Sequence, residues 1–138
     1  MEAFCDSIDL FNEMYRLPRP SGLKLRDKQS LVDFADILKE EHQEVYEVIS
    51  KYNRNSLDTA TDLADWLGDI VVYCFTFARS NGIPLDRVLK IIMESNFSKL
   101  GSDGAPIYDE RGKVLKGPEY WKPEPKICSL LGEVNESN

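Results

Sequence analysis

The glutamates at positions 40, 41 and 44 form the pattern EExxE. Apolar side chains recur at intervals of three and four across residues 27–52, which predicts an amphipathic helix. On that helix Glu41 falls inside the apolar stripe and Glu44 projects from its edge, while Glu40 and Glu47 lie further round, toward the opposite face. A core-facing carboxylate is costly unless it is paired or bound to a cation. Glu41 is therefore a candidate functional residue, whereas Glu40 and Glu47 alone are ordinary for solvated surface.

A second acidic strip follows in the next helical pattern. Asp58, Asp62, Asp65 and Asp69 are spaced four, three and four apart, which places them within about 60° of one another on a helical wheel. Asp69 directly precedes an apolar run, so it too interrupts apolar surroundings. Carboxylates that two helices bring together cannot all remain ionised without cations. Ligation by oxygen alone is the preference of Mg²⁺ or Mn²⁺, so these residues predict a divalent-cation site.

Several other polar or aromatic residues are weaker candidates. Asn96 and Lys99 continue the core-facing line of a later helix, and beside an acidic metal cluster they suit the oxygens of a phosphate chain. Lys116 adds movable positive charge on the segment that follows. Trp66 could stack on a base, although a core tryptophan is the more ordinary role. His42, the only histidine, points toward the apolar stripe and is placed outside the site.

The elements that must position these residues are helices. Four are expected, and their boundaries have recognisable signals: prolines and a glycine after the first, an Asn-Arg-Asn break after the second, a Ser or Asp cap and an Asn-Gly stop around the third, and a proline start for the fourth. We expect an all-α protein of one domain over residues 1–138, with a helical core at about 3–100, an irregular C-terminal arm or short hairpin at about 101–127 and a frayed tail at 128–138. The four helices are expected at 3–16, 27–52, 56–80 and 84–100.

Composition limits the classes of function. The chain has 138 residues and a formal net charge of −7, which disfavours bulk electrostatic binding to a nucleic acid polymer. No apolar run approaches the length of a membrane span, and the acidic N-terminus is unlike a signal peptide, so we expect a cytoplasmic protein. The three cysteines lie far apart without CxxC spacing, which indicates neither a disulfide framework nor a zinc site.

Taken in order, the motifs resemble those of the MazG-like superfamily of all-α NTP pyrophosphohydrolases. The similarity covers about residues 8–125 and is closest to a branch of small proteins related to phosphoribosyl-ATP pyrophosphohydrolase and dUTPase. EExxE alone is a weak signal, but the ordered set is fairly specific. Its parts are EEHQE at 40–44, DWLGD at 65–69, ESNFSKL at 94–100, DGAPIY at 103–108 and GKVLKGPEY at 112–120.

The resemblance implies a Mg²⁺-dependent enzyme, with Mn²⁺ as an alternative, that cuts a nucleoside triphosphate between its α and β phosphates. The family's second motif is ExxD, but here Trp66 stands three residues before Asp69, so the acid paired with Asp69 is either Asp62 or Asp65. The resemblance also implies roles for the residues at the matching positions. Metal ligation falls to Glu41, Glu44, Asp65 and Asp69, with Asp62 as the alternative; catalysis to Glu40 and Glu41; and substrate binding to Asn96, Lys99, Lys116 and Trp66.

Members of this family form dimers or dimers of dimers, and the apolar stretch Ile70–Phe77 needs more burial than one small chain easily supplies. We therefore expect a four-helix bundle completed by oligomerisation, as a homodimer or a dimer of dimers.

Two other functions stay open at this stage. One is hydrolysis of phosphoribosyl-ATP, and the other is a non-catalytic helical dimer that binds metal or nucleotide.

Overall fold

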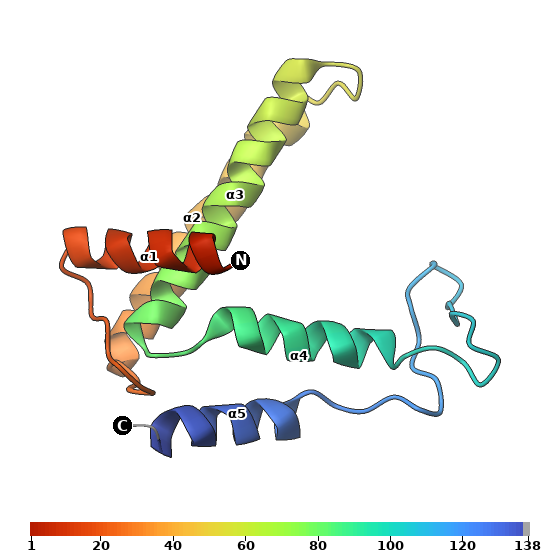
Figure 1. Cartoon of the computed structure of the whole chain (residues 1–138). Helices are drawn as coiled ribbons and strands as arrows, with labels where there is room; N and C mark the ends of the chain where they lie inside the picture. Colours follow the sequence, from red (N-terminus) through yellow and green to blue (C-terminus); the bar gives the residue numbers. More distant parts are fainter. Residues whose placement is uncertain (137–138) are drawn as a thin grey trace. The chain divides into compact units, whose positions relative to one another are not determined.

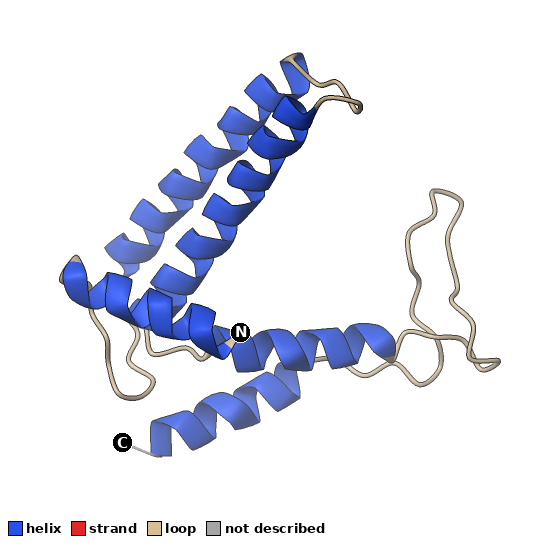
Figure 2. Cartoon of the chain, turned by 45° about the horizontal axis from the view of Figure 1, so that its top comes forward, coloured by secondary structure: helices blue, strands red, loops and turns tan. Residues whose placement is uncertain are grey.

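The computed structural model describes residues 1–136. This part of the chain is helical and contains no β-strand; one isolated antiparallel bridge joins Tyr108 and Val114 (Figures 1 and 2). The expected all-α class is therefore confirmed. There are five helices rather than four: α1 Glu2–Met14, α2 Lys28–Ser50, α3 Leu57–Ser80, α4 Leu85–Phe97 and α5 Glu124–Glu136.

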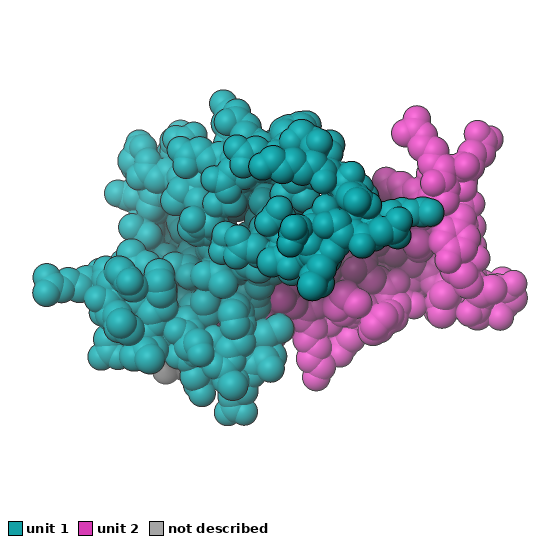
Figure 3. Space-filling model, turned by 90° about the horizontal axis from the view of Figure 1, so that it is seen from above, with its two compact units in different colours: residues 1–83 teal, residues 84–138 magenta. Residues whose placement is uncertain are grey.

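The chain divides into two compact units, residues 1–83 and residues 84–138 (Figure 3). In the first unit α2 and α3 lie side by side as a long helical hairpin, and α1 crosses the C-terminal half of α3. That a single domain spans both units stays a prediction.

The ends of the long helices follow from local capping. Asp27 caps α2 by accepting a hydrogen bond from the Ser30 backbone N–H at 2.9 Å, and Ser56 caps α3 by accepting one from the Thr59 N–H at 3.4 Å. The Phe4 ring of α1 meets Phe75 of α3 edge-on, with centroids 4.9 Å apart. The capped helices hold residues 40–48 of α2 opposite residues 62–69 of α3, which is where the candidate site forms.

An ion-pair network ties α1 to the end of α3. The Asp9 carboxylate accepts hydrogen bonds from Arg79 Nε at 2.6 Å and from Arg19 NH1 at 2.7 Å, and Arg79 NH1 also donates to the Pro20 carbonyl. The hydrogen bond from Arg79, its positive charge and then the contacts from Arg19 hold the pKa of Asp9 below its ordinary value of 3.8, against an opposing effect of burial.

A depressed carboxylate pKa stabilises the folded state above the unfolded pKa, and that contribution is lost as the pH falls through the folded pKa. We therefore expect Asp9→Asn to be less stable than the wild type at pH 6, by no more than about 1 kcal/mol because Asp9 is 39% exposed. The difference should shrink as the pH falls below about 4. Urea unfolding at pH 6 and pH 3 measures it. A difference of equal size at both pH values would contradict the assignment.

The second unit contains α4, the arm and α5. The arm returns to the end of α4, because the Gly117 N–H donates to the Lys99 carbonyl at 2.8 Å and the Leu115 N–H donates to the Ile107 carbonyl. Ser95 of α4 is buried, and its hydroxyl donates to the Trp121 carbonyl at 2.8 Å. α4 and α5 contact each other. The arm thus has hairpin-like connections without forming strands.

The expectation of a frayed tail at 128–138 is wrong for residues 128–136, which belong to α5; residues 137 and 138 lie outside the described part. Pro125 sits in the first turn of α5, where its missing N–H would have no helical partner in any case. Ile127, Leu130, Leu131 and Val134 recur with helical spacing and are at least partly buried. This apolar face, rather than the flanking prolines, decides the local structure.

The expected burial of the apolar run in α3 is only partly observed. Phe75 is buried, but Val71 and Val72 on the same run are 46% and 37% exposed. Oligomerisation therefore stays a prediction. No helix among residues 1–136 combines the length and the apolarity that crossing a bilayer requires.

Candidate active site

Acidic side chains from α2 and α3 surround one open cavity of about 350 Å³ in the first unit. The half of the helical hairpin that carries it lies away from α1. The walls also include one cation, Lys51, and two apolar side chains, Val48 and Trp66. The carboxylates on the walls are Glu44 and Glu47 of α2 and Asp62, Asp65 and Asp69 of α3.

Glu41 is the buried carboxylate of this cluster. Its residue is 7% exposed, and its Oε2 atom has no hydrogen-bond partner. Burial raises the pKa of Glu41, the neighbouring Glu44 carboxyl and then the Asp69 charge raise it further, and the Tyr73 hydroxyl partly opposes them. The prediction that Glu41 faces inward is confirmed. A buried acceptor without a partner beside two other acids is a feature that needs a functional explanation.

Tyr73 is a member of the site that the sequence reasoning missed. Burial raises the pKa of Tyr73, and the charges of Glu41, Asp69 and Glu44 raise it further, so its hydroxyl keeps its proton at neutral pH. The signal was present in the spacing, because Tyr73 stands four residues after Asp69 and so shares its face of α3.

Trp66 joins the two helices at the site. Its indole Nε1–H donates a 2.7 Å hydrogen bond to the backbone carbonyl of Glu41. The residue that occupies the place of the family's expected acid therefore fixes the α2 backbone at the buried carboxylate. Stacking of Trp66 on a substrate base stays a prediction.

The structure brings most of the predicted acids together. Glu44, Asp62, Asp65 and Asp69 line the cavity, and Glu41 lies beside them. Glu40 is exposed and does not line the cavity, so its catalytic role stays a prediction.

Glu47 is exposed, as expected, and it also lines the open cavity one turn after Glu44. His42 is exposed and meets the Tyr46 ring edge-on rather than packing in the core, and it does not line the cavity.

The predicted substrate-binding residues other than Trp66 belong to the second unit. Asn96 is exposed, Lys99 is half-buried, and the Lys116 ammonium lies 4.9 Å from the centre of the Tyr120 ring. That these three residues approach the acidic cavity stays a prediction.

The donor set fits a hard divalent cation by its chemistry. The acids that line the cavity offer only oxygen ligands, and the unpartnered Glu41 Oε2 supplies a further acceptor. Five carboxylates against one lysine leave negative charge that a cation would neutralise. Within residues 1–136, however, no three or more His, Cys, Asp or Glu side chains converge closely enough to hold a metal ion as they stand. Loading would therefore require these side chains to move together.

Comparison with known proteins agrees with this picture. Residues 29–96 match the family model of the MazG nucleotide pyrophosphohydrolase domain. A search of solved structures found a protein from Exiguobacterium sp. 255-15, described as a "putative NTP pyrophosphohydrolase", which is 21% identical over 82% of this chain and 69% of that chain, with a TM-score of 0.58. A likeness at this identity shows the fold. The comparison with curated proteins gave no match.

Proposed function

We propose that the protein is a divalent-metal-dependent enzyme that converts a nucleoside or deoxynucleoside triphosphate into the monophosphate and pyrophosphate. The match of residues 29–96 to the model of the MazG nucleotide pyrophosphohydrolase domain supports a hydrolase that acts on nucleotide anhydrides. The observation that carries the proposal is the buried Glu41 carboxylate with its unpartnered Oε2, beside Glu44 and Asp69. These residues all lie within the matched segment.

Glu41, Glu44, Asp65 and Asp69, with Asp62 as the alternative, are the residues that would hold Mg²⁺ or Mn²⁺. When bound, the cation neutralises phosphate oxygens and lowers the pKa of water. The protein's part is to supply the ligands from two helices that Trp66 holds in register.

The reaction moves one proton and breaks one bond. Water adds to the α-phosphorus and forms a new P–O bond. The bond between the α-phosphorus and the bridging oxygen breaks, and that oxygen leaves with pyrophosphate. The proton released by the water needs an acceptor, and Glu40, exposed next to the buried ligand Glu41, is the candidate base. The Tyr73 hydroxyl stays protonated and is a hydrogen-bond donor to Glu41.

Substrate binding needs positive charge, because the chain itself carries a net charge of −7. We propose that Asn96, Lys99 and Lys116 contact phosphate or sugar oxygens, and that nucleotide binds weakly when no divalent cation is present.

The test is pyrophosphate release from the standard dNTPs and NTPs, dUTP, oxidised nucleotides and phosphoribosyl-ATP, each with Mg²⁺, with Mn²⁺ and with EDTA. We expect release from at least one nucleoside triphosphate with metal and none in EDTA. Release from phosphoribosyl-ATP alone would replace the proposed substrate. Nucleotide binding without any release would contradict the enzymatic proposal and favour a helical metal- or nucleotide-binding dimer.

We also propose a homodimer or a dimer of dimers in the cytoplasm. Exposed apolar side chains on the α2–α3 hairpin support the oligomer, because water-exposed apolar surface of this kind is what a second copy would bury. They include Ile49, Leu67, Val71 and Val72. Light scattering of the purified protein is expected to give at least twice the 15.8 kDa chain mass, and a clean monomer would contradict this part of the proposal.

A further inference from the structure

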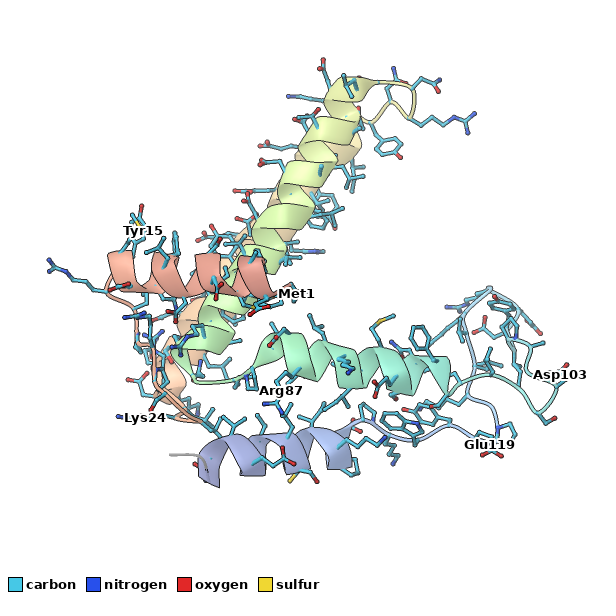
Figure 4. All side chains as sticks on the ribbon, in the orientation of Figure 1. Met1, Tyr15, Lys24, Arg87, Asp103 and Glu119 are labelled. Atoms are coloured by element: carbon cyan, nitrogen blue, oxygen red, sulfur yellow. The ribbon has the colours of Figure 1, made fainter. Side chains whose placement is uncertain are left out.

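A second cavity of the first unit lies far from the acidic one, where the segment between α1 and α2 passes the end of α3. Its volume is about 390 Å³. Three of the seven lining residues are cations, and none is an acid. The seven are Pro18, Arg19, Pro20, Lys24, Leu25, Arg26 and Ser80. Figure 4 shows Lys24 on this connecting segment.

Two of the three cations have no acidic partner. Among residues 1–136, no ion pair joins Lys24 or Arg26 to a carboxylate, and the only side-chain hydrogen bond of Arg26 runs from NH1 to the Ser80 hydroxyl at 3.5 Å. Arg19 is shared with Asp9 and Glu13. Unpaired cations gathered on one cavity of a protein with net charge −7 give it a local potential opposite to that of the whole molecule.

The backbone that carries these cations is held in place. The Lys24 N–H donates to the Asn81 carbonyl at 3.0 Å, and the Arg26 N–H donates to the Asn81 side-chain Oδ1 at 2.8 Å. Arg79 binds the Pro20 carbonyl at 2.8 Å. Asn81 is buried at the end of α3. The backbone on which the cations stand is thus fixed before any ligand arrives, so that only their side chains need to be ordered on binding.

We propose that this cavity is an anion-binding site for a phosphate group, with Lys24 and Arg26 as its charged contacts. Guanidinium and ammonium groups are the side chains that bind phosphate by charge-assisted hydrogen bonds. Pro18, Pro20 and Leu25 add apolar wall, which suits a phosphate attached to an organic group.

A smaller cavity of about 170 Å³, whose lining includes one acid, Asp33, adjoins the cationic one. It shares Arg26 and Ser80 with the cationic cavity, contains the stacked rings of Phe34 and Phe77, and includes Tyr73, whose hydroxyl interacts with Glu41. Along α3, Asp69 and Ser80 are separated by about 16 Å. The phosphate therefore has two possible sources, a second phosphate at the far end of the nucleotide substrate or a separate effector; the first source rests on the proposed function.

The site is tested by titrating the full-length protein with inorganic phosphate and with pyrophosphate in EDTA, using isothermal calorimetry. EDTA keeps the acidic cavity free of cation, so it repels these anions. We expect the double variant Lys24→Ser/Arg26→Gln to bind at least tenfold more weakly than the wild type, which corresponds to about 1.4 kcal/mol. The backbone donors of both residues are retained, so circular dichroism should be unchanged.

The matched control is Lys39→Ser/Arg54→Gln, which removes the same charge from exposed positions on the same unit. It should bind within twofold of the wild type. If both double variants bind phosphate equally weakly, the effect is one of net charge and the proposed site is wrong. Absence of phosphate binding by the wild type would also overturn the proposal.

The source of the phosphate is separated by kinetics on the same proteins. If the distal phosphate of the substrate occupies the site, Lys24→Ser/Arg26→Gln should raise the KM of phosphoribosyl-ATP, whose second phosphate lies beyond the base, at least fivefold, with little change for ATP. Equal KM values combined with lost phosphate binding identify a separate effector. Absence of turnover from every nucleotide would overturn the proposed function, while the calorimetric result would still decide the anion site.

Discussion

Glu41→Gln is expected to lower the rate of pyrophosphate release at least a hundredfold while leaving the protein folded. Removing a group that only supports a metal ligand lowers metal affinity or activity ten- to a hundredfold. Glu41 is proposed as a ligand itself, so its loss should have a larger effect. The amide keeps the shape of the side chain, and its new N–H₂ group has the Glu44 carboxylate beside it as an acceptor. Steady-state kinetics at saturating Mg²⁺ measure the loss.

The same variant separates function from stability. When folding raises the pKa of an acid, the folded state binds its proton more tightly than the unfolded state does. The folded state is therefore progressively destabilised as the pH rises from the unfolded-state pKa through the folded-state pKa. For Glu41 the unfolded value is 4.5. In EDTA at neutral pH, Glu41→Gln should therefore unfold at a higher temperature than the wild type. Addition of Mg²⁺ should raise the Tm of the wild type but not that of the variant.

Asp36→Asn provides the control, since it also changes an acid of α2 to an amide but at an exposed position outside the cavity. It should keep wild-type kinetics and the Mg²⁺-dependent rise in Tm. Activity of Glu41→Gln within threefold of the wild type would remove Glu41 from the site.

The helical hairpin and its inward carboxylate are predictable because both depend on local patterns. Intervals of three and four define the buried face of α2, and a glutamate on that face is visible from spacing alone. The caps at Asp27 and Ser56 are equally local. α5 lies outside the four expected helices, although Pro125 in its first turn is compatible with a helix that has an apolar face.

The remaining features depend on contacts between distant residues. Glu47 lines the cavity because α3 lies opposite that side of α2, which a helical wheel of α2 alone cannot show. The hydrogen bond from Trp66 to Glu41 joins residues 25 apart in the chain. The cationic cavity depends on how the segment 15–27 returns to the end of α3, and no periodic pattern encodes that return.

The path of the segment 15–27 back to the end of α3 depends on Gly82. Gly82→Ala is expected to destabilise the first unit by about 3 kcal/mol or more. Gly82 has φ +70°, and a Cβ placed on it would lie 1.9 Å from the Gly22 carbonyl oxygen. Neither backbone can yield easily, because the linker after Gly22 is bonded to Asn81 through the Lys24 and Arg26 N–H groups. Urea unfolding monitored by circular dichroism measures the loss.

Gly112→Ala supplies the comparison that isolates the steric part of this effect. Gly112 has a similar φ of +79°, but nothing lies within 4 Å of a Cβ placed there. Gly112→Ala should therefore lower the stability by only about 1–2 kcal/mol, which is the cost of a left-handed backbone at a residue with a Cβ. Equal losses in the two variants would mean that backbone conformation, and not the close approach of Gly22, limits position 82. If the approach is the cause, Gly82→Ala should also weaken phosphate binding at Lys24 and Arg26, because the displaced linker carries both cations.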